Sequence, residues 1–296
     1  MEPILSTALA DISRDVDRMF DVLLPVPDDQ RAPLFHAMRH ASIGGGKRLR
    51  PLLVVAASQL FNVDHAAALR VGCAVEAIHV YSLIHDDLPC MDNDDMRRGK
   101  PTVHKAFDEA IAVLAGDSLH ALAFELVVDD AVSTDPFVRI ELAEGLARAS
   151  GPIGMAGGQM MDIAAETQTF DLHGVTRLQQ MKTGALIAFS VEAGAIMGRV
   201  PNEARGSLRG YARDVGLAFQ IADDLLDEEG DEELAGKALH KDVAAGKATF
   251  LSLLGVERAR AQARMLVDQA ISHLNSFGPE ADLLRAIARY SIERDR

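Results

Sequence analysis

The chain has no tryptophan, only two cysteines, and aromatic residues at just 5% of its 296 positions. Cys73 and Cys90 are too few for a disulfide framework, and no Cys/His cluster has the spacing of a zinc site. This cysteine usage is typical of a reducing compartment, so we expect a cytoplasmic protein. The N-terminus is acidic and amphipathic, whereas a signal peptide needs a basic start and an unbroken apolar run.

Positive charge is scarce as well, because 30 lysines and arginines face 44 aspartates and glutamates, which gives a net charge of −14. Such acidity repels nucleic-acid phosphates, and we expect no nucleic-acid partner. No apolar run reaches the roughly 20 residues of a membrane-spanning helix, and we expect no membrane insertion. Hydrophobic residues nevertheless make up 48% of the chain, enough for a large core.

Apolar residues recur at helical spacing along almost the whole chain, and we find no series of alternating strands with short turns. This pattern predicts an all-α fold. No linker, low-complexity segment or short-period repeat divides the sequence, so we expect a single domain over residues 1–296. The predicted helices span about residues 3–22, 30–42, 51–61, 65–88, 105–128, 136–165, 174–197, 202–227, 248–275 and 280–292.

Acidic residues gather in LIHDDLPCMDNDD, where Asp86 and Asp87 end a long predicted helix and Asp92 follows in a bend. Carboxylates at a helix C-terminus face the negative end of the helix dipole, which costs up to about 1 kcal/mol before their mutual repulsion is counted. We therefore expect a positive group to offset them. A solvated acidic loop would also explain this cluster if it stood alone.

A second cluster, FQIADDLLD, places Asp223, Asp224 and Asp227 on one helix face together with Gln220. Two apolar helices thus carry paired aspartates followed by a third. Such groups of hard carboxylate oxygens suit Mg²⁺, which keeps several waters and completes its coordination with phosphate oxygens. The spacing does not fit a calcium EF-hand, and an all-oxygen ligand set disfavours zinc.

Basic residues gather beside glycine-rich turns and behind the aspartates, although the chain as a whole is acidic. Arg97 and Arg98 directly follow the first cluster, and further lysines and arginines lie in GGGKRLRP, MKTG and AGKALHKDVAAGKATF. Each segment alone is a weak phosphate-binding signal. Together they predict a ligand with more than one phosphate group, held partly through metal and partly by the cations.

These motifs resemble, in type and order, the short-chain trans-prenyltransferases, or isoprenyl diphosphate synthases. The resemblance runs from GGGKRLRP through both aspartate motifs, LAGDSL, GGQMMD and MKTGAL to the terminal YSIERDR. It implies antiparallel helices around a large central cavity in the isoprenoid synthase fold, and a homodimer. It also implies condensation of an allylic diphosphate, dimethylallyl or geranyl, with isopentenyl diphosphate.

The resemblance further implies a role for each site residue. Three Mg²⁺ ions would lie on Asp86, Asp87, Asp92, Asp223, Asp224 and Asp227. The allylic diphosphate would contact Arg97, Lys182, Lys237 and Lys247, and isopentenyl diphosphate would be held by Lys47, Arg50, His79 and Arg98. The carbocation of such a reaction needs neutral dipoles and no competing water, and we expect the oxygens of Thr183 and Gln220 and the Lys182 backbone carbonyl to supply them.

Two of these positions also have simpler interpretations. His79 lies two helical turns before Asp86, about 10 Å away on the same face, but a core histidine would explain it equally. His240 stands where many relatives of this family have glycine, so the loop after the second cluster, and any role of Lys241, stay open.

Tyr81 lies five residues before Asp86, a position that in this family often closes the pocket for the growing chain. A ring there and the long spacer with Pro89 resemble the bacterial farnesyl diphosphate synthases, whose product has fifteen carbons. The small Ser82 keeps geranylgeranyl diphosphate synthesis open, and Tyr81 could also be an ordinary packing residue. A noncatalytic subunit and a class I terpene cyclase are weaker alternatives, because both aspartate clusters and the isopentenyl motif are present.

Overall fold

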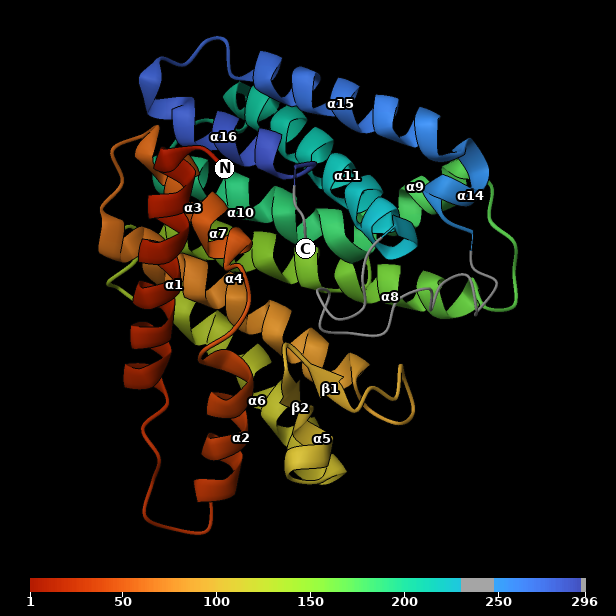
Figure 1. Ribbon diagram of the computed structural model, residues 1–296. Coiled ribbons are helices and arrows are strands. Elements are labelled where there is room, and N and C mark those ends of the chain that lie inside the picture. Colours follow the sequence, from red (N-terminus) through yellow and green to blue (C-terminus); the bar gives the residue numbers. More distant parts are fainter. Residues whose placement is uncertain (230–247, 294–296) are drawn as a thin grey trace.

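The structure is a computed structural model that describes residues 1–229 and 248–293, and apart from one short β-hairpin its regular secondary structure there is helical (Figure 1). The predicted all-α class is confirmed. The elements are α1 (Pro3–Leu23), α2 (Ala32–Ser42), α3 (Leu49–Gln59), α4 (His65–Asp86), β1 (Met96–Arg97), β2 (Lys100–Pro101), α5 (Val103–Ala106), α6 (Glu109–Val128), α7 (Pro136–Ser150), α8 (Met155–Ala164), α9 (Leu172–Gln179), the π-helix η1 (Gln180–Gly184), α10 (Ala185–Met197), the 3₁₀ helix η2 (Asn202–Arg205), α11 (Gly206–Glu229), α14 (Phe250–Leu254), α15 (Val256–His273), the 3₁₀ helix η3 (Pro279–Ala281) and α16 (Asp282–Tyr290).

Helix α4 forms the centre of the bundle and contacts α1, α2, α3, α6 and α10. Apolar residues cover nearly its whole circumference, and most of them are buried. Because each fully buried aliphatic side chain contributes roughly 1.5–3 kcal/mol, the helix is firmly held. Its C-terminal end, directed towards the β1–β2 hairpin in Figure 1, carries the first aspartate cluster on a rigid support.

The β1–β2 hairpin was not predicted from the sequence. It pairs Met96 with Pro101 and Arg97 with Lys100 in antiparallel register. Both turn residues, Arg98 and Gly99, have positive φ, 53° and 74°, as the two-residue turns that match strand twist require. Strands of two residues are too short to produce an alternating pattern, which is why the sequence did not indicate them.

Several predicted helices are in fact interrupted. The predicted helix 136–165 is α7 and α8, which are separated around Gly154, where an added Cβ would lie 2.2 Å from the Ala149 carbonyl oxygen. The predicted helix 105–128 divides at Asp108, whose side chain accepts a hydrogen bond from the Ile111 N–H and caps α6. These breaks are caused by close backbone contacts and helix caps. Neither changes the spacing of apolar residues, so the hydrophobic pattern did not indicate them.

Two helices, α4 and α6, are long and apolar enough to cross a membrane by length and composition alone, a test that core helices of globular proteins also pass. In α4, 72% of the apolar window is buried within the protein, as in a core helix. In α6 the share is 39%, and Val113 and Leu114 are exposed. Helix α6 therefore has an apolar face that the described part of the chain does not cover.

Candidate active site

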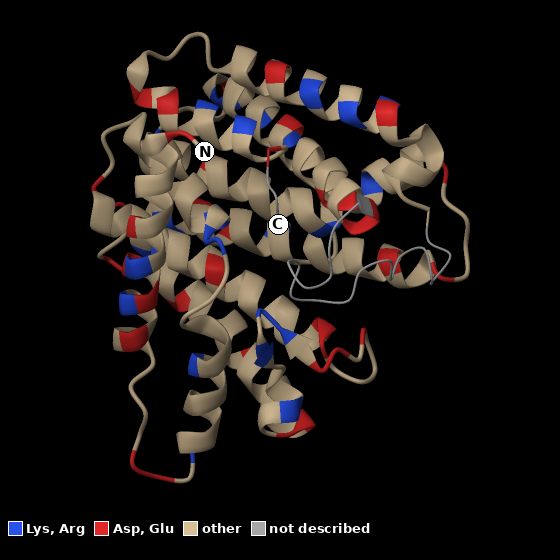
Figure 2. Ribbon diagram, in the orientation of Figure 1, with Lys and Arg blue, Asp and Glu red and all other residues tan. Residues whose placement is uncertain are grey.

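A pocket of about 290 Å³ lies beside the C-terminal half of α4 and is bordered by α3, α8 and η1. It brings together predicted site residues from three separate motifs. They are Arg50 of the glycine-rich segment, His79, Tyr81, Ser82 and Asp86 of α4, and Lys182 and Thr183 of η1. Figure 2 shows that basic residues on the β1–β2 hairpin lie next to acidic residues at the C-terminal end of α4.

Asp86 is the last residue of α4 and lines this pocket, half-buried. Burial raises the pKa of its carboxyl group to about 6, and the neighbouring Asp92 adds to the rise, whereas Lys182 and Arg97 oppose it. When burial and a neighbouring carboxylate raise the pKa of a carboxyl group, a nearby cation stabilises its charged form.

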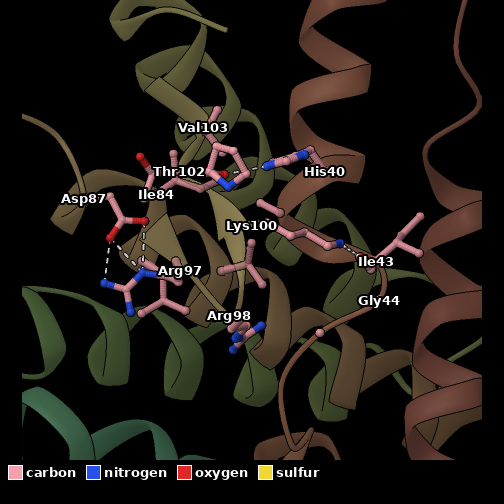
Figure 3. Close-up of a pocket in the computed structure, with 15 residues that line it drawn as sticks. His40, Ile43, Gly44, Ile84, Asp87, Arg97, Arg98, Lys100, Thr102 and Val103 are labelled. Carbon is pink, nitrogen blue, oxygen red and sulfur yellow. Dashed lines mark hydrogen bonds and ion pairs between the residues drawn. The ribbon is translucent and has the colours of Figure 1, made fainter. Parts of the chain in front are cut away.

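Asp87 follows directly as the C-cap of α4 and is 3% exposed. Its carboxylate accepts hydrogen bonds from Arg97 Nε at 2.7 and 3.0 Å (Figure 3), and Arg97 also reaches Asp94 at 3.5 Å. Burial raises the pKa of Asp87, and the Arg97 hydrogen bonds counter that rise. The expected positive group at the end of α4 is thus Arg97.

Arg50 lines the pocket with a buried Nε that has no hydrogen-bond partner among the described residues. Burial lowers its pKa and Arg98 adds to the lowering, while Glu76 and Asp223 raise it. A guanidinium stays protonated at neutral pH, so a buried N–H without an acceptor indicates that an anionic ligand fits here. Burial lowers the pKa of His79, and the positive charges of Arg50 and Arg98 lower it further. His79 is therefore neutral and contributes an N–H donor without charge.

The second aspartate cluster is tied to the pocket by hydrogen bonds. Thr183 Oγ1 donates to Gln220 Oε1, and Gln220 Nε2 donates to Asp224 Oδ1, both at 3.3 Å. The Phe250 N–H donates to Asp224 Oδ2 at 2.9 Å. Gln220 and Asp224 thus share a helix face, as the spacing predicted, and Asp224 both orients the Gln220 amide and anchors the start of α14. The charge of Asp223 acts on Arg50, which places this cluster within electrostatic range of the pocket.

Lys182 and Thr183 project from the π-helix η1, whose wider turn disturbs the regular backbone hydrogen bonding. Lys182 Nζ forms an ion pair with Asp162 of α8 at 2.7 Å. The two helices come this close only because residue 158 is glycine, since a Cβ there would lie 2.2 Å from the Lys182 nitrogen. Asp162, within GGQMMD, had received no role from the sequence.

The glycine-rich segment supplies basic residues of two kinds. Arg48 is 2% exposed and pairs with Glu76 and Asp17, both at 2.7 Å, so it holds the fold together. Lys47 is exposed beside it. Arg98 reaches the same segment from the hairpin, and a Cβ on Gly46 would lie 2.6 Å from its guanidinium carbon. Arg50 thus lines the pocket, and Arg98 contacts the glycine-rich segment that carries Lys47.

Tyr81 packs against two histidines. Its ring centroid lies 5.7 Å from His85 and 5.0 Å from His120 of α6, in edge-to-face geometry, and His120 lies 5.3 Å from Phe124. His85 Nε2–H donates to the Val113 carbonyl oxygen at 3.1 Å. His120 and Phe124 were not predicted from the sequence, because nothing in a helical pattern identifies which residue of a distant helix meets Tyr81.

Four residues named from the sequence lie outside the described residues, namely Lys237, His240, Lys241 and Lys247. Within residues 1–229 and 248–293, no group of three or more His, Cys, Asp or Glu is close enough to hold a metal ion alone. The donor set nevertheless fits Mg²⁺, because this ion needs only one or two carboxylates when substrate phosphates and waters fill its other positions. Burial raises the pKa of Asp86 to about 6, and such an ion would stabilise its charged form.

The chain is similar to known proteins over most of its length. Residues 32–288 match the family model described as polyprenyl synthetase. Farnesyl diphosphate synthase of Geobacillus stearothermophilus is 43% identical over 89% of each chain. Geranylgeranyl pyrophosphate synthase 3, chloroplastic, of Arabidopsis thaliana is 45% identical over 94% of this chain and 78% of its own.

Solved structures show the same fold. The apo structure of an FPP/GFPP synthase from Zymomonas mobilis is 63% identical, with a TM-score of 0.92 over 98% of this chain and 100% of that one. The geranyltransferase of Helicobacter pylori, complexed with magnesium and isoprenyl diphosphate, is 32% identical, with a TM-score of 0.80 over 99% and 97% of the two chains.

Proposed function

Because the chain belongs to the polyprenyl synthetase family, we propose that it condenses dimethylallyl or geranyl diphosphate with isopentenyl diphosphate and makes mainly farnesyl diphosphate. The observation that carries this proposal is the pocket that joins Arg50, whose buried Nε has no hydrogen-bond partner among the described residues, with neutral His79, Asp86 and Lys182. It offers cations for two anionic groups next to carboxylates that suit magnesium.

The reaction would proceed by ionisation, condensation and elimination. The allylic carbon–oxygen bond breaks, the double bond of isopentenyl diphosphate attacks the cation, and a proton leaves the new product. Magnesium on the aspartates would neutralise charge on the departing diphosphate. Arg97 and Lys182 would bind that diphosphate, a preorganised electrostatic effect worth several kcal/mol. Thr183 and Gln220, already joined by a hydrogen bond, would present oxygen dipoles to the cation.

Isopentenyl diphosphate would lie between Lys47, Arg50 and Arg98, with His79 as a neutral donor. Elimination would use the released diphosphate as proton acceptor, because neutral His79 is assigned to the other substrate. The test is incubation with Mg²⁺, labelled isopentenyl diphosphate and each primer, followed by chromatography. We expect labelled farnesyl diphosphate, whereas absence of any labelled prenyl product with every primer would refute the function.

Geranylgeranyl diphosphate synthesis is the second candidate. Ser82 lines the pocket beside Tyr81 and is small enough to leave room for a longer chain. Sequence identity does not separate the two, since the farnesyl and geranylgeranyl synthases compared above are 43% and 45% identical to this chain. The same chromatography distinguishes them by product length.

We also propose a homodimer through the apolar face of α6 and its neighbour α7. Val113 and Leu114 are exposed on α6, and Phe137 and Ile140 are 78% and 62% exposed on α7. An apolar area of this kind is typical of an interface. We expect sedimentation to give twice the mass of the 31.9 kDa chain. The double variant Leu114→Glu/Phe137→Glu should sediment as a monomer. A wild-type monomer at micromolar concentration would contradict the dimer.

Arg98 adopts left-handed backbone geometry with φ of 53°, which costs a non-glycine residue about 1–2 kcal/mol. Such strain is typical of residues retained for function. We expect Arg98→Gly to lower kcat/KM for isopentenyl diphosphate about 100-fold, through lost charge-assisted hydrogen bonds. The same variant should keep or slightly raise Tm, because glycine relieves the strain.

Arg98→Ala is the matched control, since it removes the same charge but keeps a Cβ in the strained position. It should lose as much activity and melt below the glycine variant. An unchanged KM for isopentenyl diphosphate in both variants would remove Arg98 from the site.

A further inference from the structure

We propose that Lys100 is a positioning residue that ties the β1–β2 hairpin to the glycine-rich loop, and so fixes Arg98 relative to Lys47 for binding one diphosphate. The inference rests on the proposed function, because it assigns Arg98 and Lys47 to isopentenyl diphosphate. Lys100 itself would not touch the substrate.

The ammonium group of Lys100 lies at the end of α2. Its Nζ donates a hydrogen bond to the Ile43 carbonyl oxygen at 3.0 Å (Figure 3), and Ile43 is the C-cap of α2. The last carbonyls of a helix lack intrahelical donors and carry partial negative charge, so a cation is favourable there. A Cβ on Gly44 would lie 3.5 Å from the same Nζ. Lys100 therefore contacts the start of the loop that carries Lys47.

The other end of the connection is the hairpin itself. Lys100 is the cross-strand partner of Arg97, and Arg98 lies in the turn between them. Arg97 is in turn fixed by Asp87 at the end of α4. A movement of Lys100 would therefore shift the turn on which Arg98 is mounted.

A second tie supports the first. His40 of α2 donates from Nε2 to the Pro101 carbonyl oxygen at 2.8 Å, next to Lys100 in the same strand. In Figure 3, the side chains of Lys100 and His40 both bridge the hairpin and the α2 region, and Arg98 lies apart from these two contacts. The hairpin is thus bound to α2 on one side, and on the other side its Arg98 side chain packs against Gly45 and Gly46.

Lys100→Met tests the role because methionine keeps an apolar stem but cannot donate to Ile43. We expect KM for isopentenyl diphosphate to rise about tenfold, the effect of one lost charge-assisted hydrogen bond. kcat and the KM for the allylic primer should change less than about twofold. Lys100→Arg should restore the low KM, because it can donate to the same carbonyl.

Lys105→Met is the control, since Lys105 pairs with the exposed Asp95 at 2.9 Å and does not touch the glycine-rich loop. It should leave every kinetic constant unchanged. An equal rise of both KM values in Lys100→Met, or an equal effect in Lys105→Met, would overturn the proposal.

A second measurement needs no substrate. Lys47 is an exposed trypsin site, and trypsin does not cut at Lys100 because Pro101 follows it. Loosening the loop should speed cleavage after Lys47 several-fold in Lys100→Met but not in Lys105→Met. Unchanged cleavage refutes the tie. Faster cleavage in a protein whose wild type makes no prenyl product would instead support the tie and refute the proposed function.

Discussion

Asp86→Asn is expected to lower turnover by about 10³-fold while making the protein more stable above pH 6. The loss follows because the amide cannot supply the anionic oxygen for magnesium, and electrostatic groups of this kind are worth two to three orders of magnitude. The gain in stability follows from the raised pKa of Asp86, about 6 in the fold against 3.8 for the unperturbed group.

The direction of the pH dependence is fixed by proton binding. Between pH 4 and pH 6 the folded wild type holds a proton on Asp86 that the unfolded chain has lost, so its stability falls as pH rises through this range. Asparagine carries no charge and shows no such fall. The Tm of Asp86→Asn should therefore equal that of wild type below pH 4 and exceed it above pH 6, as differential scanning calorimetry without metal would show.

Added Mg²⁺ together with inorganic diphosphate, which supplies the phosphate oxygens that the substrate would, should reverse the order. The raised pKa of Asp86 costs the wild type about 3 kcal/mol of stability above pH 6, whereas a ligand that binds only the folded protein stabilises it by about 4.1 kcal/mol at 1,000 times its Kd. This gain should be largely lost in Asp86→Asn. Asp95→Asn is the control, because it removes one charge from the same acidic segment at a side chain that is 71% exposed. If Asp86→Asn kept near-normal turnover, or if Mg²⁺ with inorganic diphosphate raised its Tm as much as that of wild type, Asp86 would not be a metal ligand.

Features encoded by short-range spacing were predicted well from the sequence. Asp86 and Asp87 end α4, because an apolar helix followed by Pro89 has only a few places to stop. Gln220 and Asp224 meet because residues four apart share a helix face. Both statements need only local geometry.

Features that depend on contacts between distant segments were not predicted. The closeness of Lys182 to Asp162 requires a glycine at position 158 in another helix. Likewise, Arg48 and Arg50 are two residues apart in GGGKRLRP, but one neutralises buried acids and the other faces the pocket. A basic motif shows that cations are present, while only the packing of α3 against α4 determines what each one meets.

Product length should depend on an aromatic barrier in two layers, which leads to the second large effect. We expect Tyr81→Ser to shift the main product from fifteen to twenty carbons, because its ring lines the pocket and its loss opens space towards His120. The pKa of His120 is lowered by burial, so the second layer is a neutral ring backed by Phe124. This second layer should stop the prenyl chain from growing beyond twenty carbons in Tyr81→Ser.

Tyr81→Ser combined with His120→Ala should therefore give products longer than twenty carbons, and His120→Ala alone should give a mixture, since Tyr81 then loses its edge-to-face partner. Tyr81→Phe is the control that keeps the ring and should keep the fifteen-carbon product. Chromatography of the dephosphorylated products measures all four. If Tyr81→Ser made the wild-type product, the growing chain would run in another direction, and the small side chain of Ser82 would mark the place to look, because it lines the same pocket.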